Sequence, residues 1–193
     1  MKLSQLLLAA ALVLQIGCSN PKAASNENFT KAVSAYLMHQ EESGAYCIGA
    51  KVDHFQEEAP GAGPGETNGA FVKMGFLNIE RQYRTRMGFF TMTVYDLTPK
   101  GRESFTQGRG FCLGKPELIR VINFTDPGPT GSVSNVMYSY RLSDVPSWAT
   151  GSDGQAFRSR IPGANGEVQR TDTFVLTGNG WVHHSLAPPV GRI

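Results

Sequence analysis

The sequence predicts an α+β protein in which helices dominate the beginning and an antiparallel sheet dominates the second half. Apolar residues recur at helical spacing over 27–42, which indicates one buried helix face. Over 136–142 large apolar residues stand at every second position, which is typical of a half-buried strand. The chain also has 22 glycines and 11 prolines among 193 residues, and this composition favours short strands and turns over a helical bundle.

The first helix, over 27–42, is expected to begin at a cap formed by Asn26 or Asn28, because a short polar side chain can accept a hydrogen bond from the exposed amides. Its buried face carries Phe29, Val33, Tyr36 and Leu37. A short strand over 46–52 and a loop over 56–68 follow. The loop is rich in glycine, but it lacks the Lys-Ser or Lys-Thr step that a phosphate-binding P-loop places after its glycines.

The stretch 69–105 shows the longest recognisable succession of elements. The succession is a helix over 66–77, an extended run over 76–81, a basic turn, a second extended run over 89–97, and a helix that starts at residue 98. Gly75 suits the left-handed residue that stops the first helix. Thr98 can cap the second helix, and Pro99 stands at its first position, where a missing amide hydrogen costs nothing.

This order of elements resembles the back half of a winged-helix domain, in which a helix ending in LVKxGLL leads into a two-stranded wing that closes on YxLTxxGR. The matching segments are FVKMGFL at 71–77 and YDLTPKGR at 95–102, and residues 29–42 could supply the first helix. The resemblance implies a winged-helix-like N-terminal half over 29–105, packed with an antiparallel sheet half over 116–187.

In winged-helix proteins the helix before the wing usually enters a groove of DNA. A helix with that role exposes side chains that contact bases and phosphates, but 66–77 offers a single cation, Lys73. The preceding helix would lie in 55–65, whose prolines and glycines cannot hold a regular helix. The formal net charge is only +2, which implies no basic face. We therefore expect a wing-like packing unit that binds no nucleic acid.

The second half predicts strands over 118–125, 136–142, 168–177 and 181–186. A tight turn at 178–180 joins the last two. After the second strand, Asp144 can cap a helical turn that Trp148 anchors in the core, and residues 150–167 are expected to be irregular. The strands should form one antiparallel sheet against the first helices, within a single domain over 29–187.

The first residues indicate export. Lys2 precedes an apolar run over 6–14, and a basic start, a run of this length and a small residue before a break predict a signal peptide over 1–17 instead of a transmembrane helix. The Gly-Cys step at Cys18 resembles the lipobox of bacterial lipoproteins, in which the cysteine becomes the lipidated first residue, carrying fatty acids such as palmitate. Gln15 stands where that family prefers leucine. An ordinary cleaved signal without lipid is the alternative.

Ser19, not aspartate, follows Cys18. By resemblance to the sorting rule of Gram-negative lipoproteins, this implies the periplasmic face of the outer membrane. Residues 18–28 would then be a small, polar tether between the lipid and the domain. The segments 138–149 and 176–181 are also similar to segments of uncharacterised proteobacterial lipoproteins, a similarity that brings no activity with it.

If Cys18 carries a lipid, Cys47 and Cys112 remain as an even pair. In an oxidising compartment such a pair predicts a disulfide. It would tie the strand near 45–52 to the segment after the central stretch. The alternative is two buried free thiols.

No pattern in the sequence marks a catalytic, metal or cofactor site. His183 and His184 are neighbours, and neighbours on a strand point to opposite faces, so we expect histidines that are solvated or that cap a turn. Asp96 lies on a strand whose expected partner is the arginine-rich turn. His39 and His54 are distant in sequence from the two neighbouring histidines. Glu57 and Glu58 lie in the predicted loop, and Asp144 and Asp153 fit turns better than a catalytic pair. A site can still assemble in space from distant residues.

The basic turn is the best candidate for a contact surface. Its residues are Arg81, Tyr83, Arg84 and Arg86. Arginine and tyrosine are favoured in protein interfaces. On an exported protein this surface could meet an acidic protein, anionic lipid headgroups or a glycan; a solvated hairpin without a partner is the alternative.

These observations favour an exported, lipid-anchored envelope protein with a non-catalytic binding or accessory role. A DNA-binding winged-helix regulator is the first alternative, and it would be reduced and bind DNA with an affinity that falls with salt. A periplasmic hydrolase is the second, and it would need two or more acidic or histidine groups in one pocket.

Overall fold

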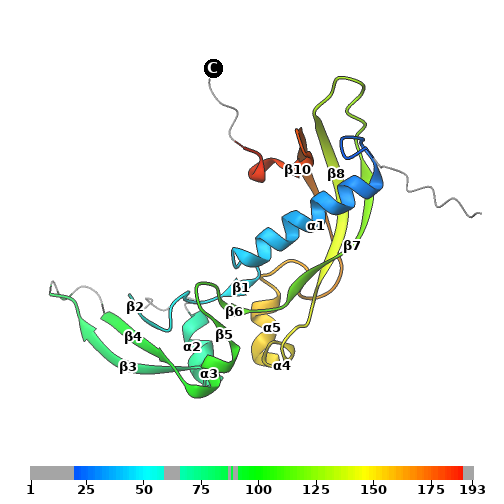
Figure 1. Ribbon diagram of the computed structural model, residues 1–193. Helices are drawn as coiled ribbons and strands as arrows, with labels where there is room; N and C mark the ends of the chain where they lie inside the picture. Colours follow the sequence, from blue (N-terminus) through cyan, green and yellow to red (C-terminus); the bar gives the residue numbers. More distant parts are fainter. Residues whose placement is uncertain (1–19, 59–65, 87, 89–90, 189–193) are drawn as a thin grey trace, which may run out of the picture.

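The computed structural model of the chain describes residues 20–58, 66–86, 88 and 91–188. It shows an α+β fold of antiparallel sheets with helices packed on them. In Figure 1 a long helix lies along a four-stranded sheet, and a three-stranded sheet with short helices occupies the opposite end of the molecule. The signal peptide predicted over 1–17 and the predicted lipidation site Cys18 lie outside the described residues.

The four-stranded sheet, here called the large sheet, is antiparallel throughout and has the strand order β10-β9-β8-β7. Its strands are β7 (Lys115–Phe124), β8 (Val133–Ser143), β9 (Val168–Thr177) and β10 (Gly180–His183). The antiparallel sheet predicted for the second half is therefore confirmed. Its last strand ends earlier than predicted, because the chain turns into the 3-10 helix η1 (His184–Leu186).

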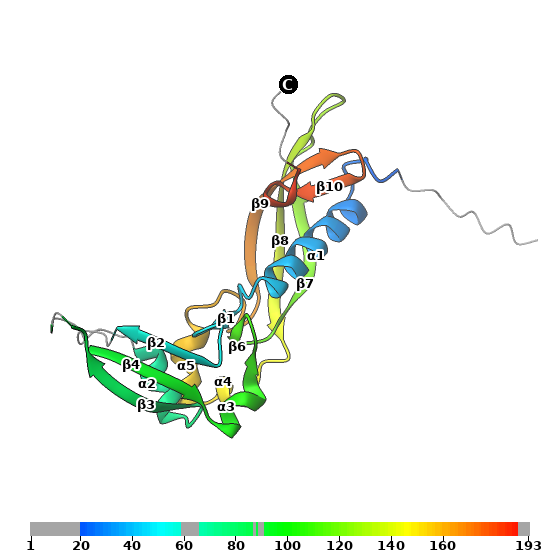
Figure 2. The same cartoon turned by 60° about the vertical axis from the view of Figure 1, so that its left-hand side comes forward.

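Helix α1 (Asn26–Glu42) lies across one face of the large sheet, against β7 and β10, as Figures 1 and 2 show. Its predicted apolar face is buried, and Phe29 and Val33 are fully inaccessible to solvent. The ring of Phe29 contacts three aromatic rings, those of Phe124, Phe174 and Trp181. Aromatic side chains from both layers thus make the core between α1 and the sheet.

The cap of α1 differs from the prediction. Ser25, not Asn26 or Asn28, is the N-cap, and its hydroxyl accepts a hydrogen bond from the Asn28 amide at 3.3 Å. The buried side chain of Asn28 instead donates to the carbonyl oxygens of Asn20 and Ala23, each at 2.9 Å. Asn28 therefore fastens the segment that precedes the helix.

Residues 20–25, inside the stretch predicted as a tether over 18–28, are also attached to the large sheet. The indole Nε1 of Trp181 donates to the carbonyl oxygens of Lys22 and Ala23, at 3.3 and 3.2 Å. Together with Asn28, these bonds fix the point at which the chain enters α1.

The three-stranded sheet, here called the outer sheet, has the order β2-β4-β3. Its strands are β2 (His54–Glu58), β3 (Leu77–Arg84) and β4 (Thr91–Leu97). The pairing of β3 with β4 confirms the two extended runs predicted in the central stretch. Strand β2 corrects the prediction of a loop from residue 56, because β2 is held by β4, which lies far along the chain.

Two helices predicted in the central stretch flank the outer sheet. Helix α2 (Glu66–Lys73) precedes β3, and helix α3 (Pro99–Ser104) follows β4. The cap of α3 is the predicted one, with the Thr98 hydroxyl accepting from the Gly101 amide at 2.9 Å. Gly101 is buried against the carbonyl group of Phe76, where a Cβ atom would overlap the oxygen. This close approach explains why glycine stands at that position of the helix.

The resemblance to a winged-helix domain is not confirmed. The order of helix, two strands and capped helix is present from α2 to α3. However, α1, which the resemblance assigns to the same unit, packs on β7 and β10 of the large sheet. The packing of α1 therefore gives no support to a winged-helix-like unit over 29–105, and what stands is an α+β fold.

A third, small sheet, here called the junction sheet, connects the two ends and has the order β1-β6-β5. Its strands are β1 (Cys47–Ile48), β5 (Phe105–Thr106) and β6 (Gly110–Cys112). Phe111 of β6 packs against Phe71 of α2 and against Phe76, with ring centroids 4.2 and 5.4 Å apart. One hydrophobic cluster thus includes residues of the large, junction and outer sheets.

Helices α4 (Ser147–Thr150) and α5 (Ser152–Arg158) complete this part of the core. Trp148 packs edge-on against Phe71, which confirms its predicted role as an anchor, and Phe157 stacks on the same ring with centroids 4.8 Å apart. The aromatic cluster therefore joins α2 to both short helices.

Two predictions for this region are wrong. Residues 150–167 were expected to be irregular but contain α5. Its seven residues include a glycine and are too few to show a clear helical pattern of apolar residues in the sequence. Asp144 does not cap α4, because Pro146 is the N-cap and Asp144 has a φ of +53°. Its carboxylate instead lies 3.8 Å from Nζ of Lys115.

Candidate functional site

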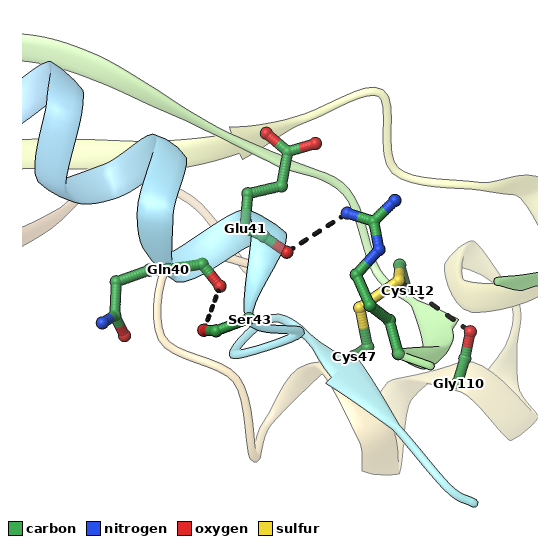
Figure 3. Close-up of a disulfide and its surroundings, with 7 residues drawn as sticks. Gln40, Glu41, Ser43, Cys47, Gly110 and Cys112 are labelled. Carbon is green, nitrogen blue, oxygen red and sulfur yellow. Dashed lines mark hydrogen bonds between the residues drawn. A yellow bond between two sulfur atoms is a disulfide. The ribbon is translucent and has the colours of Figure 1, made fainter. Parts of the chain in front are cut away.

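The two cysteines predicted to pair do form a disulfide. Cys47 and Cys112 are register partners on β1 and β6, so the bond crosses the junction sheet directly. Figure 3 shows the bond beside the C-terminal end of α1, where the Glu41 carbonyl accepts a hydrogen bond from Arg109 at 3.2 Å. The alternative of two free thiols is excluded. The bridged residues are 65 positions apart, and the whole outer sheet lies between them in the chain.

The structure divides the predicted contact residues between the two faces of the outer sheet. Arg81 and Tyr83 share a face of β3, whereas Arg84 belongs to the other face, because successive residues of a strand alternate. The Arg81 guanidinium lies 5.8 Å from the ring centre of Tyr83, a cation–π distance. Arg86 follows in the turn after β3 and is exposed. The contact role of these four residues stays a prediction.

A second polar group on the outer sheet consists of His54 of β2, Glu80 of β3 and Asp96 of β4. His54 and Asp96 are register partners, and the His54 Nδ1 makes a hydrogen bond with the Asp96 carboxylate. Oε2 of Glu80 lies 3.9 Å from the same nitrogen. One potential ligand atom from each residue lies within 4.8 Å of the others, so these three residues could hold a metal ion. We call them the His54 group.

Sequence reasoning missed the His54 group because it depends on the register of three strands. β2 was predicted as loop over most of its length, and Asp96 was expected to face the arginine-rich turn. Strand β4 does pair with the arginine-bearing β3, but the carboxylate of Asp96 contacts His54. The local sequence gives no signal for Glu80, because it stands at a β-bulge between Ile79 and Arg81, where simple strand alternation does not hold.

The His54 group is open to solvent and negatively charged. Its side chains are 57 %, 44 % and 39 % exposed for His54, Glu80 and Asp96. The hydrogen bond to Asp96 raises the pKa of His54 above 6.5, and the charges of Asp96 and Glu80 act in the same direction, while Arg81 opposes them. A cation and a solute from bulk water can therefore reach these side chains.

The large sheet carries a contrasting polar group that is packed against α1. Tyr138 donates to Asp172 at 2.6 Å, and Nε of Arg170 lies 2.7 Å from the same carboxylate oxygen. Arg170 also donates to the hydroxyl of Tyr36 on α1 at 3.2 Å. Burial and then the hydrogen bond to Asp172 raise the pKa of Tyr138, so its phenol stays a hydrogen-bond donor at neutral pH. This group fixes α1 to the sheet.

His183 extends the same polar group. Its ring stacks on Tyr36 with centroids 3.6 Å apart, and burial lowers its pKa. Nδ1 accepts from the Ser185 amide at 3.2 Å and caps η1, which confirms the expectation of a capping histidine. The Ser185 hydroxyl also reaches Nδ1 at 2.7 Å, but Nε2 and the Asp172 carboxylate are 4.0 Å apart, beyond hydrogen-bond distance. These contacts pack the His183 ring against α1 and cap η1.

A cavity of about 200 Å³ opens at the junction sheet beside the disulfide. Charged residues of both signs line it, namely Glu41, Arg109, Lys115 and Asp144. Lys115 and Asp144 face each other, and Arg109 is bound to the backbone of α1. Of these groups, Arg109 links the end of α1 to the segment between β5 and β6 of the junction sheet.

The remaining candidates from the sequence are dispersed. His39 lies in the last turn of α1, Asp153 in the first turn of α5, and Glu57 and Glu58 belong to β2. His184 is exposed in η1, next to the buried His183. None of the contacts described for this fold brings these residues together as one site.

Comparisons with known protein families, with curated proteins and with solved structures find no match to this chain. Among the residues that the structure describes, no helix has both the length and the apolar character needed to cross a membrane. The function has to be inferred from the arrangement of the residues themselves.

Proposed function

We propose that the chain is an exported protein of the cell envelope, anchored by a lipid at Cys18 on the periplasmic face of the outer membrane, that binds a partner and catalyses no reaction. The observation that carries this proposal is the Cys47–Cys112 disulfide. Disulfides persist in oxidising compartments and are rare in the reducing cytosol. The bond therefore supports the export signal over 1–17, and with it the Gly-Cys step that resembles a lipobox.

The distribution of polar side chains supports binding over catalysis. In the large sheet Tyr138 and Arg170 both bond to Asp172, and this network supports the fold. The outer sheet instead exposes an edge strand, β3, on which Ile79 and Tyr83 are 48 % and 41 % accessible. Exposed apolar and aromatic side chains next to arginines are a composition found in interfaces.

A protein with an acidic surface is the partner that this strand fits. Arg81, Arg84 and Arg86 concentrate positive charge toward the β3–β4 turn, which Figure 2 places at the end of the outer sheet farthest from the large sheet. Opposite charges on two surfaces accelerate their encounter and disfavour wrong partners. Arg81 and Arg84 lie on opposite faces of the sheet, which suits a partner that contacts both faces at the edge.

The intact mass of the protein tests anchoring and export together. The full chain is expressed in bacteria, and the membrane fraction is measured with and without reduction. The expected product begins at Cys18, carries acyl groups and gains two hydrogens on reduction. A cytosolic product that retains residues 1–17 would overturn export and would promote the DNA-binding alternative, whose DNA affinity must fall as salt rises.

Photo-crosslinking in cells tests the contact surface. A crosslinking residue at position 83 should give a discrete adduct with an envelope protein, and Arg84→Glu should lower the adduct yield about tenfold if the contact contributes the ~1.4 kcal/mol of an interface residue. Arg120→Glu is the matched control, because Arg120 is an exposed strand arginine of the large sheet. An equal yield in the Arg84 variant, or adducts with lipid only, would remove the proposed protein contact.

A further inference from the structure

The geometry points to a binding site for a divalent transition-metal ion on the outer sheet, with His54, Glu80 and Asp96 as its ligands. The three residues come from β2, β3 and β4, so a bound ion would join every strand of this sheet. The inference is independent of export and of the lipid anchor, because it depends only on side chains of the described fold.

The backbone brings the three side chains close together. His54 and Asp96 are register partners on antiparallel strands, and such partners project from the same face with Cβ atoms about 5 Å apart. Glu80 stands at a β-bulge of β3, between Ile79 and Arg81, which pair with the consecutive residues Tyr95 and Val94 of β4. From this bulge its Oε2 reaches to 3.9 Å from Nδ1 of His54. Each strand therefore presents one ligand without any change in the backbone.

The ligand atoms are close enough for one ion. Nδ1 of His54 contacts the Asp96 carboxylate and lies 3.9 Å from Oε2 of Glu80, and all three ligand atoms fall within 4.8 Å of one another. In a tetrahedral zinc site with bonds of about 2.0–2.2 Å, ligand atoms are about 3.4 Å apart. Because the three side chains are exposed, rotations about their side-chain bonds can bring the ligand atoms to this spacing.

The types of ligand select the class of ion. One imidazole nitrogen and two carboxylate oxygens suit Zn²⁺ and neighbouring first-row metals, whereas Ca²⁺ and Mg²⁺ prefer oxygen ligands throughout. Neutral His54 with ionised Glu80 and Asp96 carries two negative charges, which a divalent ion balances. Three protein ligands leave one tetrahedral position open to water or to a group on a bound molecule.

An ion pair between His54 and Asp96 accounts for only part of this arrangement. Protonated His54 needs one carboxylate, and Asp96 supplies it by a direct hydrogen bond. Glu80, at 3.9 Å, is too far for a hydrogen bond and adds a second negative charge beside the first. The two carboxylates repel each other, and a bound cation turns this repulsion into a favourable interaction.

Calorimetric titration of Zn²⁺ into the full-length protein, purified in detergent and freed of metal with a chelator, tests the site. We expect saturable binding of one ion per chain. Glu80→Gln and Asp96→Asn keep the size of the side chain and remove its charge, and each should weaken Zn²⁺ binding at least about tenfold, since even outer-shell changes cost about 10–100-fold. His54→Ala should abolish the binding.

Two exposed residues of the same types serve as matched controls. His39→Ala and Glu103→Gln change a histidine of α1 and a carboxylate of α3, and both should leave the Zn²⁺ affinity unchanged. Visible absorption of bound Co²⁺ gives a second readout, which should be present in the controls and absent in His54→Ala. Because the three ligands are exposed, the variants should keep the circular dichroism spectrum of the parent.

Three results would overturn the site. They are the lack of saturable Zn²⁺ binding, binding that survives both His54→Ala and Glu80→Gln, and binding that His39→Ala weakens as much as His54→Ala does. The last result would assign the ion to scattered surface histidines. None of these results changes the mass of the anchored protein or the yield of the crosslink, so failure of the metal site and failure of the proposed function are separable.

Discussion

The large sheet and the outer sheet each bring a histidine to an aspartate, but only one of the two pairs is open to water. In the large sheet the side chains of His183 and Asp172 are 4 % and 13 % exposed, and their nearest atoms are 4.0 Å apart. In the outer sheet the His54 side chain is 57 % exposed and bonds directly to Asp96. Burial lowers the pKa of His183, whereas the bond to Asp96 raises the pKa of His54.

Exposure to water determines whether a histidine–aspartate pair supports the fold or is available for binding. The buried pair belongs to a network in which Tyr138 and Arg170 bond to Asp172 and Arg170 reaches Tyr36 on α1, so its groups are committed to the fold. An exposed ion pair contributes little to stability, about 0–1 kcal/mol. The outer sheet can therefore lose or exchange the partners of His54 without unfolding, which is what a binding site requires.

The largest expected loss of stability comes from a substitution in the core of the large sheet. Phe29→Ala removes a fully buried ring that contacts Phe124, Phe174 and Trp181, and it should lower the free energy of unfolding by about 4–5 kcal/mol. Ile79→Ala on the half-exposed edge of the outer sheet is the control and should change it by less than about 1 kcal/mol. Urea unfolding measures both, and a similar loss in the two variants would refute the distinction between the sheets.

The next effect concerns the bond that connects the two regions. Cys47→Ala opens a loop of 65 residues, and the entropy of loop closure predicts a loss of roughly 4 kcal/mol under oxidising conditions. In reductant the variant and the parent should unfold at similar urea concentrations. An equal loss in both conditions would mean that the cysteine contributes by packing alone.

A matched pair of substitutions compares the two aspartates directly. Asp172→Asn weakens the ion pair with Arg170 and the hydrogen bond from Tyr138 and should cost about 2 kcal/mol. Asp96→Asn, measured with a chelator present, should cost less than about 0.5 kcal/mol. The reverse order of these two losses in thermal or urea unfolding would show that the exposed pair is the structural one.

The smallest expected effect is the dependence of stability on pH. His183 has a lower pKa in the folded protein than the 6.5 of the unfolded chain, so the unfolded state binds more protons and stability should fall as the pH drops below about 6.5. His54 has a raised pKa, so its contribution is present below 6.5 and is lost as the pH rises through the folded-state value.

Single substitutions of the two histidines separate these contributions. With a chelator present, His183→Gln should flatten the loss of stability toward acid, and His54→Gln should steepen it. Urea unfolding from about pH 5 to pH 8 provides the measurement. If both variants shift the slope in the same direction, the opposite environments assigned to the two rings are wrong.

Elements that depend on local patterns could be predicted from the sequence. The period of α1, the alternation along β8 and the cap formed by Thr98 and Pro99 all appear where expected, because each depends on residues a few positions apart. Strand β2 was largely missed because β4 stabilises it from far along the chain. Helix α5 was missed because its stability comes from Phe157 packing on Phe71.

The same distinction applies to the candidate sites. The pairing of Cys47 with Cys112 could be predicted, because only two cysteines remain beside Cys18 and a pair of cysteines in an oxidising compartment is expected to form a disulfide. The His54 group could not, because its three members meet only through strand register. The arginines were predicted as one surface, but alternation along β3 separates Arg81 from Arg84, a consequence that requires the exact strand boundaries.

The attachment of residues 20–25 to the large sheet determines how far the protein can reach. Trp181 holds Lys22 and Ala23 at the end of α1 that Figure 1 shows farthest from the outer sheet. Helix α1 has 17 residues and therefore spans about 25 Å. With the proposed anchor at Cys18 and α1 directed away from the bilayer, the outer sheet would be carried beyond the headgroups of its own membrane. Its arginines and the His54 group would then meet molecules of the intervening space, and lipids of the anchoring leaflet would be out of their range.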